Sequence, residues 1–176
     1  MPSLLTYRLL PELSEGGAST TLAGRLELAG MDHGVMHLEL PEGIGYQLRL
    51  TNTGSGVLLS GSVAATARTE CMRCLEPAEL ELAGEVEAYY VLDSADAELA
   101  AEDDTAILVG RDGNVDLAEP ILAGLVFELP FVALCREDCK GLCPKCYANL
   151  NHEECSCPDE PDPDHPLAAL RNLVIE

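Results

Sequence analysis

A cysteine-rich stretch, residues 134–158, constrains this chain more than any other feature. It reads LCREDCKGLCPKCYANLNHEECSCP and holds six of the eight cysteines, which are Cys135, Cys139, Cys143, Cys146, Cys155 and Cys157. Thiolates are soft, anionic ligands, and zinc takes four of them in a tetrahedron. Two cysteines separated by two residues, as in the CPKC of residues 143–146, can hold one ion from a tight turn. Because paired spacings in so short a span are a strong sign of a metal site, we expect four of these six cysteines to bind one ion.

Zinc is the expected metal, and disulfide bonds are the main alternative. The cysteines stand among Lys, Asp, Glu, Asn and Pro, with no apolar run in which they would simply be buried. Disulfides require an oxidising compartment, whereas the N-terminal MPSLLTYRLLPEL lacks the features of a signal peptide. We therefore expect reduced thiols, a cytoplasmic location and one or two zinc ions. An iron–sulfur cluster held by the same thiols ranks below zinc.

The other two cysteines, Cys71 and Cys74, form an isolated CMRC and leave the number of sites open. The six-cysteine stretch can satisfy one ion by itself, with thiols to spare. Alternatively, the CMRC completes a second four-thiolate site with those spare thiols. A zinc ribbon that joins the CMRC to the CPKC is a third arrangement. Cys71 and Cys74 are therefore second-tier candidate ligands.

The net charge of −21 argues against a general nucleic-acid-binding surface, because such proteins usually carry a basic face. Five of the ten Lys and Arg residues nevertheless flank the cysteines, namely Arg68, Arg73, Arg136, Lys140 and Lys145. They form a candidate patch for RNA or a protein partner if the two cysteine regions meet in space. The competing explanation is that they only offset the negative charge of thiolate sites. No segment approaches the apolar length of a membrane-spanning helix, so we expect no membrane partner.

Residues 1–134 are expected to form a mainly antiparallel β body. Its clearest pattern is residues 78–92, where Leu, Val, Ala and Tyr alternate with Glu, as in a strand that is buried on one face. Residues 57–70 form a second β-rich run, and the CMRC stands between the two, where it would cap a long hairpin. The predicted fold class is α+β. It combines an antiparallel sheet or barrel-like body with one packed helix and a cysteine-rich, metal-binding C-terminal segment.

The packed helix is predicted at residues 117–129, where apolar side chains recur at three- and four-residue spacing. Asp116 is its expected N-cap, with Glu119 as the capping-box partner. The cysteines follow this helix directly, so residues 135–176 form the second part of the chain, a cysteine-rich tail. That tail ends in an acidic, proline-rich linker and a short predicted helix at residues 166–174.

The order of these motifs resembles the large-subunit ribosomal RNA accumulation protein family (YceD) of bacteria and plastids. The matching pieces cover roughly residues 45–176, and they are CMRCLEP, VDLAEPIL, LCREDCKGLCPKCYANLN, ECSC and DPDHPLAALRNL. The resemblance implies a non-catalytic accessory factor for large-subunit ribosomal RNA that binds metal. Its partner would be a large-subunit ribosomal RNA precursor or a ribosomal protein. One departure is Tyr147, where the metal-binding turn usually has glycine, the residue that tolerates a left-handed backbone.

Two other classes of function compete with this interpretation. In a thiol-based redox or metal-handling protein, spare thiols would react, and nearby Arg136 and Lys140 would favour their thiolate forms. In an enzyme, His, Asp and Glu side chains would converge around a substrate, and the sequence shows no such constellation. We therefore expect a structural zinc site, no catalytic residue and no small-molecule substrate.

Overall fold

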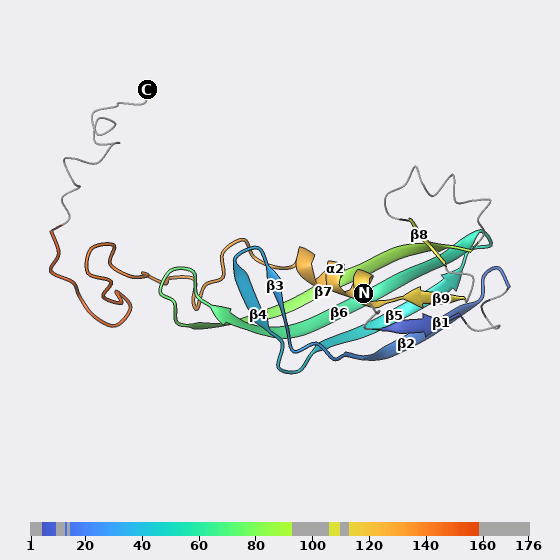
Figure 1. Ribbon diagram of the computed structural model, residues 1–176, viewed down its shortest axis with the longest axis horizontal. Helices are drawn as coiled ribbons and strands as arrows, with labels where there is room; N and C mark the ends of the chain where they lie inside the picture. The colour runs from blue at the N-terminus through green and yellow to red at the C-terminus, as the bar shows by residue number, and fades with distance from the viewer. Residues whose placement is uncertain (1–4, 10–12, 14, 93–105, 110–112, 159–176) are drawn as a thin grey trace, which may run out of the picture.

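The computed structural model describes residues 5–9, 13, 15–92, 106–109 and 113–158. Its centre is a hairpin of two fifteen-residue strands, β6 (Gly56–Glu70) and β7 (Pro77–Val91), which pair over their whole length. Small and β-branched side chains in β6 and the apolar alternation of β7 suit a pleated surface that is buried on one side. The hairpin runs along the long axis of the molecule, and the CMRC forms its turn (Figure 1).

Four strands extend the hairpin on the β6 side. Strand β5 (Ile44–Asn52) pairs antiparallel with β6 and carries β2 (Ser19–Leu26) on its other edge. Nearer the CMRC, β4 (Met36–Glu39) pairs with β6 at Arg68 and carries β3 (Gly30–His33). The strands on this side therefore form two separate pairs along the length of β6.

The sheet is mostly antiparallel, and it stays open. Strand β8 (Ala106–Leu108) runs parallel to β7, whereas β1 (Thr6–Arg8) and β9 (Asn114–Asp116) form a separate two-stranded sheet. Within the described ranges, the edge strands β2 and β8 do not pair with each other. The α+β fold class is confirmed, but the body is an open sheet and does not close into a barrel.

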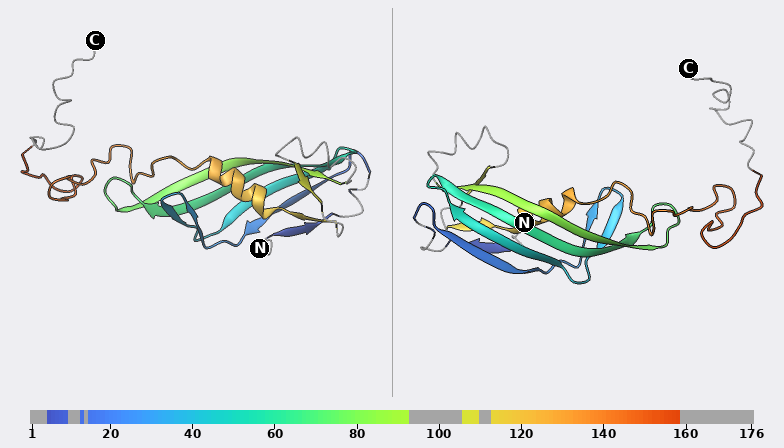
Figure 2. Two further views of the ribbon diagram at one scale, coloured as in Figure 1. Left: turned by 45° about the horizontal axis from the view of Figure 1, so that its top comes forward. Right: turned by 180° about the vertical axis from the view of Figure 1, so that it is seen from behind.

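One face of the sheet is covered by α2 (Ala118–Phe127), which is the packed helix of the prediction (Figure 2). Ile121 and Leu125 are fully buried where the helix meets the apolar side chains of the strands. The helix approaches β7 closely because both facing positions are glycine. A Cβ atom at Gly84 would lie 2.3 Å from the carbonyl oxygen of Gly124. A larger residue at either position would therefore push the helix away from the sheet.

The start of α2 differs from the predicted capping box. The N-cap residue is Leu117, which makes no side-chain capping bond, and the carboxylate of Asp116 accepts the backbone N–H of Ala118 at 2.8 Å. The buried Tyr90 of β7 donates its hydroxyl to the carbonyl oxygen of Asp116 at 2.6 Å. A local bond from Asp116 and a contact with the sheet thus hold the helix start, and the expected capping box of Asp116 with Glu119 does not form.

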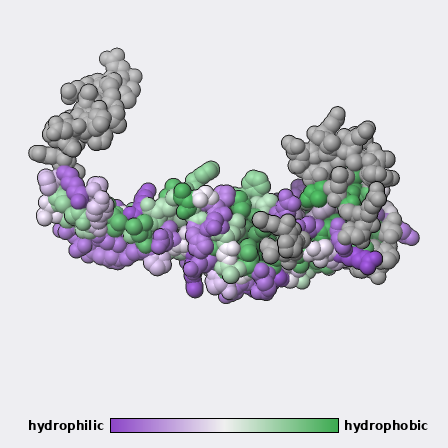
Figure 3. All heavy atoms as spheres, in the orientation of Figure 1, coloured by the Kyte–Doolittle hydropathy of each residue, from purple (hydrophilic) through white to green (hydrophobic). Residues whose placement is uncertain are grey.

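After α2 the chain runs back to the CMRC end of the hairpin and continues past it (Figure 1). Residues 128–158 contain no strand or helix beyond a single β-bridge between Leu142 and Asn149. Polar side chains cover much of the visible surface, with apolar ones interspersed near the cysteine end (Figure 3). No helix in the described part of the chain is long and apolar enough to cross a membrane. The short helix predicted at residues 166–174 lies outside the described residues, and the division of the chain at residues 134 and 135 stays a prediction.

Candidate metal centres

The CMRC turn is closed by two backbone hydrogen bonds. The N–H of Cys71 donates to the carbonyl oxygen of Glu76 at 2.8 Å, and the N–H of Leu75 donates to the carbonyl oxygen of Cys71 at 2.9 Å. Leu75 adopts a left-handed backbone with φ of 61°, which is costly for any residue with a Cβ atom. The turn brings the sulfur atoms of Cys71 and Cys74 within 4.8 Å of each other.

The CPKC turn repeats this geometry at the same offsets along the chain. The N–H of Cys143 donates to the carbonyl oxygen of Ala148 at 2.8 Å, and the N–H of Tyr147 donates to that of Cys143 at 2.9 Å. Tyr147 has φ of 60°, so it occupies the left-handed position where glycine was expected. The departure from glycine therefore leaves the turn intact and stores strain in its backbone.

The structure gathers the eight cysteines into two groups of four. Cluster 1 joins Cys71 and Cys74 to Cys135 and Cys139, with all four sulfur atoms within 4.8 Å of one another. The sulfurs of Cys71 and Cys139 are 3.8 Å apart, and those of Cys74 and Cys135 are 3.6 Å apart. Cys135 is partly buried and the other three are buried. Cluster 1 thus connects the end of the central hairpin to the segment that follows α2.

Further contacts hold that segment against the CMRC turn. The N–H of Met72 donates to the carbonyl oxygen of Ala133 at 2.9 Å, and the guanidinium of Arg73 donates to that of Cys139 at 2.9 Å. Gly141 has φ of 75°, and a Cβ atom there would lie 3.0 Å from the carbonyl oxygen of Arg73. Glycine therefore lets the chain pass close to the turn as it leaves cluster 1.

Cluster 2 consists of Cys143, Cys146, Cys155 and Cys157, whose sulfurs also lie within 4.8 Å of one another. The sulfurs of Cys143 and Cys155 are 3.4 Å apart, and the N–H of Lys145 points to the sulfur of Cys143 at 3.5 Å. Its ligands all come from one short segment, and Cys146 is exposed. Cluster 2 is therefore local in sequence and more open to solvent than cluster 1.

The distances in both clusters fit one tetrahedral metal ion. Four sulfurs at about 2.3 Å from a central ion lie about 3.8 Å from one another, and the close pairs lie at 3.4, 3.6 and 3.8 Å. A disulfide would require about 2.05 Å, and all eight cysteines are free thiols. Each cluster could therefore hold a metal ion. The CMRC shares its cluster with Cys135 and Cys139 and not with the CPKC, so the geometry differs from the ribbon arrangement.

The two cysteines of the CMRC have opposite pKa shifts. Burial acts to raise the pKa of Cys71, but backbone N–H groups, that of Arg73 first, outweigh burial and lower it to about 6. Near Cys74, the backbone N–H of Glu76 acts to lower the pKa. Burial and the three neighbouring sulfurs outweigh this bond and raise the pKa of Cys74 to about 12. Without a cation, cluster 1 therefore holds thiolates and thiols side by side.

Cluster 2 shows the same division. Backbone N–H groups of Cys146 and Lys145 lower the pKa of Cys143 to about 6. The sulfur of Cys146, together with burial, raises the pKa of Cys157 to about 12. Four sulfurs this close cannot all be ionised without a cation, because their charges repel. A divalent ion would supply that charge and displace the remaining protons.

The basic residues predicted as a partner patch have local acceptors. Four of the five make such contacts: Arg68 with Glu79 at 3.4 Å, Arg73 with the Cys139 carbonyl, Arg136 with Asp138 at 3.3 Å, and Lys145 with the Pro158 carbonyl. Two of these acceptors are carboxylates and two are backbone carbonyl oxygens, so the contacts hold these side chains locally. A role for the same side chains and Lys140 in binding a partner stays a prediction.

Sequence reasoning missed three polar residues beside cluster 1. The side-chain amide of Asn151 donates to the sulfur of Cys139 at 3.4 Å and lowers the pKa of that thiol. The ring of His152 lies 2.6 Å from the carboxylate of Glu76 and lowers the pKa of that group. For Asn151 and His152 the available signal was the Asn-rich run ANLNH between the two cysteine pairs of cluster 2, which has no helix or strand pattern, whereas Glu76 stands in the CMRCLEP motif.

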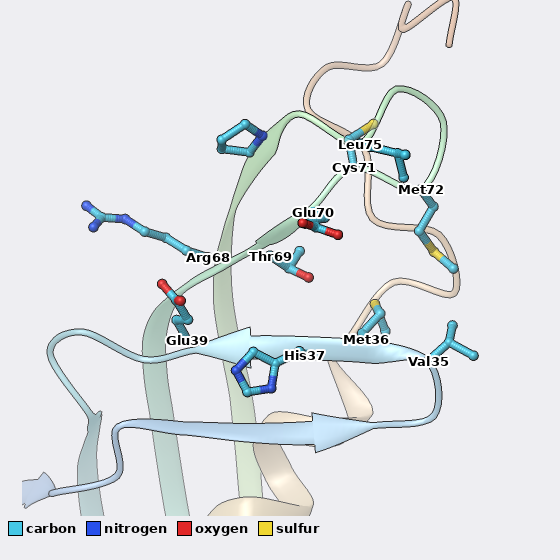
Figure 4. A pocket seen from close by; sticks show the side chains of 11 residues that line it. Val35, Met36, His37, Glu39, Arg68, Thr69, Glu70, Cys71, Met72 and Leu75 are labelled. Carbon is cyan, nitrogen blue, oxygen red and sulfur yellow. The ribbon is translucent and has the colours of Figure 1, made fainter. Parts of the chain in front are cut away.

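A hollow of about 780 Å³ lies between the CMRC turn and the β3–β4 hairpin. Figure 4 shows Val35 and Met36 on the hairpin side and Met72 and Leu75 on the turn side. Val35 is 88% exposed and Leu75 is 62% exposed. Apolar side chains thus meet solvent beside cluster 1, whereas the exposed face of β7 carries glutamates.

Comparisons with known proteins identify the family of this chain. Residues 59–174 match the family described as large ribosomal RNA subunit accumulation protein YceD. Uncharacterized proteins of Mycobacterium tuberculosis and Mycobacterium bovis are each 39% identical to the chain over 129 residues, covering 73% of this chain and 58% of theirs. The chain thus spans little more than half the length of these relatives.

A plant relative carries the same family name. The Arabidopsis thaliana protein named "Large ribosomal RNA subunit accumulation protein YCED homolog 1, chloroplastic" is 39% identical over 60 residues, covering 34% of this chain and 18% of that protein. No solved structure matches the chain. The comparisons therefore bear on the family, and the geometry of the clusters rests on the structure described above.

Proposed function

Because this chain belongs to the family of the large ribosomal RNA subunit accumulation protein YceD, we propose that it is a non-catalytic factor in the accumulation of large-subunit ribosomal RNA. We further propose that it carries two structural zinc ions, one in each cysteine cluster. The observation that carries the proposal is the pair of four-sulfur groups at tetrahedral spacing.

The distances between the sulfur atoms favour a single zinc ion over an iron–sulfur cluster. The cysteine sulfurs around a multi-iron cluster bind different irons and lie further apart than the ligands of one ion. The close sulfur pairs, at 3.4–3.8 Å, suit a single ion. Zinc prefers a tetrahedral set of thiolates, so it is the metal that both clusters would take.

A structural role follows from the completeness of each ligand set. Catalytic zinc keeps one position open for water or substrate, whereas structural zinc is closed by four protein ligands. Each cluster offers four sulfurs, which would fill every position. The ions would therefore hold the cysteine end of the molecule together without acting on a substrate.

The partner is proposed to be a large-subunit ribosomal RNA precursor or a ribosomal protein, and the charge of the chain favours the protein. The chain carries a net charge of −21, and each zinc with four thiolates adds a local charge of about −2. Direct binding along an RNA backbone would be opposed by this charge, whereas a basic ribosomal protein would be attracted to it. A cytoplasmic location is part of the proposal, because thiolate zinc sites need a reducing compartment.

A thiol-based metal-handling or redox role is the second candidate. The exposed Cys146 favours it, since exposed thiolates exchange metal and react more readily than buried ones. Alkylation of the purified protein with and without a chelator separates the two roles. A structural site protects its thiols until the metal is removed, whereas a handling site leaves a thiol that reacts quickly in the metal-loaded form.

The test of the main proposal combines metal analysis with a cellular measurement. The purified protein should contain about two zinc ions per chain, as expected for two closed sites. Cells without the protein should hold less large-subunit ribosomal RNA, and the protein should sediment with precursor subunits. Protein without zinc or iron, or normal ribosomal RNA in its absence, would contradict the proposal.

A further inference from the structure

The loop between the two cysteine pairs of cluster 2, residues 147–154, makes contact with the surroundings of cluster 1. The N–H of Leu150 donates to the carbonyl oxygen of Gly141 at 3.0 Å. Leu142, which forms a β-bridge with Asn149 in this loop, donates its N–H to the carbonyl oxygen of Arg73 at 3.1 Å. The loop is therefore seated on the short strip of chain that runs from cluster 1 to cluster 2.

Asn151 in this loop points its side-chain amide at a sulfur of the other cluster. Its oxygen accepts the backbone N–H of Lys140 at 2.8 Å and the guanidinium of Arg136 at 2.9 Å. Both of these groups can only donate, so the orientation of the amide is fixed and its nitrogen faces Cys139 at 3.4 Å. An N–H that faces a thiolate holds the ligand in place and offsets part of its charge, as outer-shell partners of metal sites do.

His152, the next residue, reaches the other half of cluster 1. Its ring lies 2.6 Å from the carboxylate of Glu76. The backbone carbonyl of Glu76 accepts the N–H of Cys71, so this contact bears on the bond that closes the CMRC turn. The other carboxylate oxygen of Glu76 lies 3.6 Å from the sulfur of Cys74. The loop thus contacts Cys139 directly, through Asn151, and reaches the CMRC pair through Glu76.

We propose that Asn151 and His152 are positioning residues that couple the two clusters, so that a metal ion in cluster 2 strengthens metal binding in cluster 1. The inference rests on the metal sites of the proposed function and adds a linkage between them. The loop is bounded by Cys146 and Cys155, so an ion in cluster 2 fixes both of its ends. Without that ion the loop has more conformational freedom, and binding at cluster 1 has to order it.

The expected size of the coupling follows from the behaviour of outer-shell residues. Loss of such a partner typically lowers metal affinity about 10- to 100-fold. Coupling between sites is reciprocal, so an ion in cluster 1 strengthens binding in cluster 2 by the same factor. Because cluster 2 draws its ligands from one short segment, it closes first, and cluster 1 fills with the loop already in place.

The test measures cadmium binding to the full chain by cadmium NMR, in which each cluster gives its own resonance, in competition with a chelator. The double substitution Cys155→Ser, Cys157→Ser disables cluster 2. Asn151→Asp keeps the oxygen that accepts from Lys140 and Arg136 but replaces the donor that faces Cys139. This double-mutant cycle compares the cadmium affinity of cluster 1 in the unchanged chain, in each variant and in the combined variant.

Disabling cluster 2 should weaken cadmium binding at cluster 1 about 10- to 100-fold when Asn151 is present. In the Asn151→Asp background the same change should cost clearly less, because the direct contact of the loop with a cluster 1 sulfur is already lost and only the His152 contact remains. His152→Ala should reduce the coupling in the same direction. The matched control is Glu153→Gln, in the same loop, whose exposed side chain makes no described hydrogen bond to cluster 1; it should leave the coupling unchanged.

An affinity of cluster 1 that stays within about twofold when cluster 2 is disabled would overturn the coupling. In that case both clusters would still bind cadmium, and the two structural sites of the proposed function would stand. A chain that binds no cadmium at either cluster would instead overturn the proposed function itself. If the coupling is equal in the Asn151→Asp chain and in the unchanged chain, Asn151 does not contribute to it.

Discussion

The two cysteine clusters begin with the same turn and are completed in different ways. The CMRC and CPKC turns share their hydrogen-bond offsets and a left-handed residue after the second cysteine. Cluster 2 finds its other pair nearby, at Cys155 and Cys157. Cluster 1 joins Cys71 to Cys139, which is 68 residues further along the chain. A local cluster directly orders its own segment, whereas a long-range one directly holds two distant parts of the fold together.

Replacing one ligand in each cluster should have the largest effect and should separate their roles. In Cys139→Ser, the metal affinity of cluster 1 should fall more than about 100-fold, beyond the loss of an outer-shell partner. Amide hydrogen exchange should then increase in both parts that cluster 1 joins, residues 71–75 and residues 131–142. In Cys157→Ser, measured at saturating zinc, the increase should stay within residues 143–158. The same widespread increase in both variants would contradict a division of roles.

Metal binding at cluster 1 should weaken strongly as the pH falls. The pKa of Cys74 is raised to about 12 and that of Cys135 is raised as well, so both thiols hold protons at neutral pH. A bound ion displaces these two protons, and affinity should therefore rise about 100-fold per pH unit between roughly pH 7 and 9. Chelator competition in the Cys155→Ser, Cys157→Ser variant measures this slope. A slope near zero would mean that the thiols are already ionised.

The ion in cluster 2 should exchange faster than the ion in cluster 1. Cys146 is exposed in cluster 2, whereas three sulfurs of cluster 1 are buried, so local opening should be easier at cluster 2. We expect two phases of metal release to a chromophoric chelator, with rates that differ about tenfold or more. The fast phase should disappear in Cys157→Ser. A single phase would show that the clusters open together.

Glycine at the left-handed positions should strengthen both turns by a similar amount. Leu75→Gly and Tyr147→Gly remove the Cβ atom that is strained at φ of 61° and 60°, and neither side chain is buried. The gain should be about 1 kcal/mol in each turn, after the entropy that glycine adds to the unfolded chain. Thermal unfolding of the zinc-loaded protein measures it. Leu75→Ala and Tyr147→Ala are the matched controls, which keep the strain and should show no gain.

The smallest effect should come from Arg68. Its ion pair with Glu79 is 3.4 Å long, and both side chains are more than half exposed, at 60% and 57%. Arg68→Ala should change the free energy of unfolding by less than about 0.5 kcal/mol and leave zinc content unchanged. Arg73→Ala is the comparison, since Arg73 donates to the Cys139 carbonyl and its loss should weaken cluster 1. Equal effects of the two substitutions would show that Arg73 does not stabilise cluster 1.

Local patterns carried most of what the sequence predicted. Alternation in residues 78–92 predicts β7 because each side chain of a strand faces one side, and that pattern needs no distant information. The paired spacing of CMRC and CPKC predicts two metal-binding turns for the same reason. The helix at Ala118–Phe127 follows from its own apolar spacing.

Long-range contacts account for what the sequence did not predict. Cys135 and Cys139 lie closer in sequence to the CPKC than to the CMRC, and only the return of the chain from α2 brings them to Cys71. In place of the expected capping box, the carboxylate of Asp116 accepts the N–H of Ala118, and Tyr90 from β7 donates to the Asp116 carbonyl oxygen, a contact that no local pattern predicts. Asn151 was not predicted because its role depends on two donors that fix the orientation of its amide, and such a contact follows from no spacing rule.

The central hairpin also sets a length scale for anything that binds the molecule. Fifteen residues of extended strand span about 50 Å, and the CMRC lies at one end of that span while Gly56 and Val91 pair at the other. The hydrogen-bonded neighbours of both strands stiffen this rod against bending. Two groups bound at its opposite tips would be held about 50 Å apart, and the protein would act between them as a spacer of fixed reach.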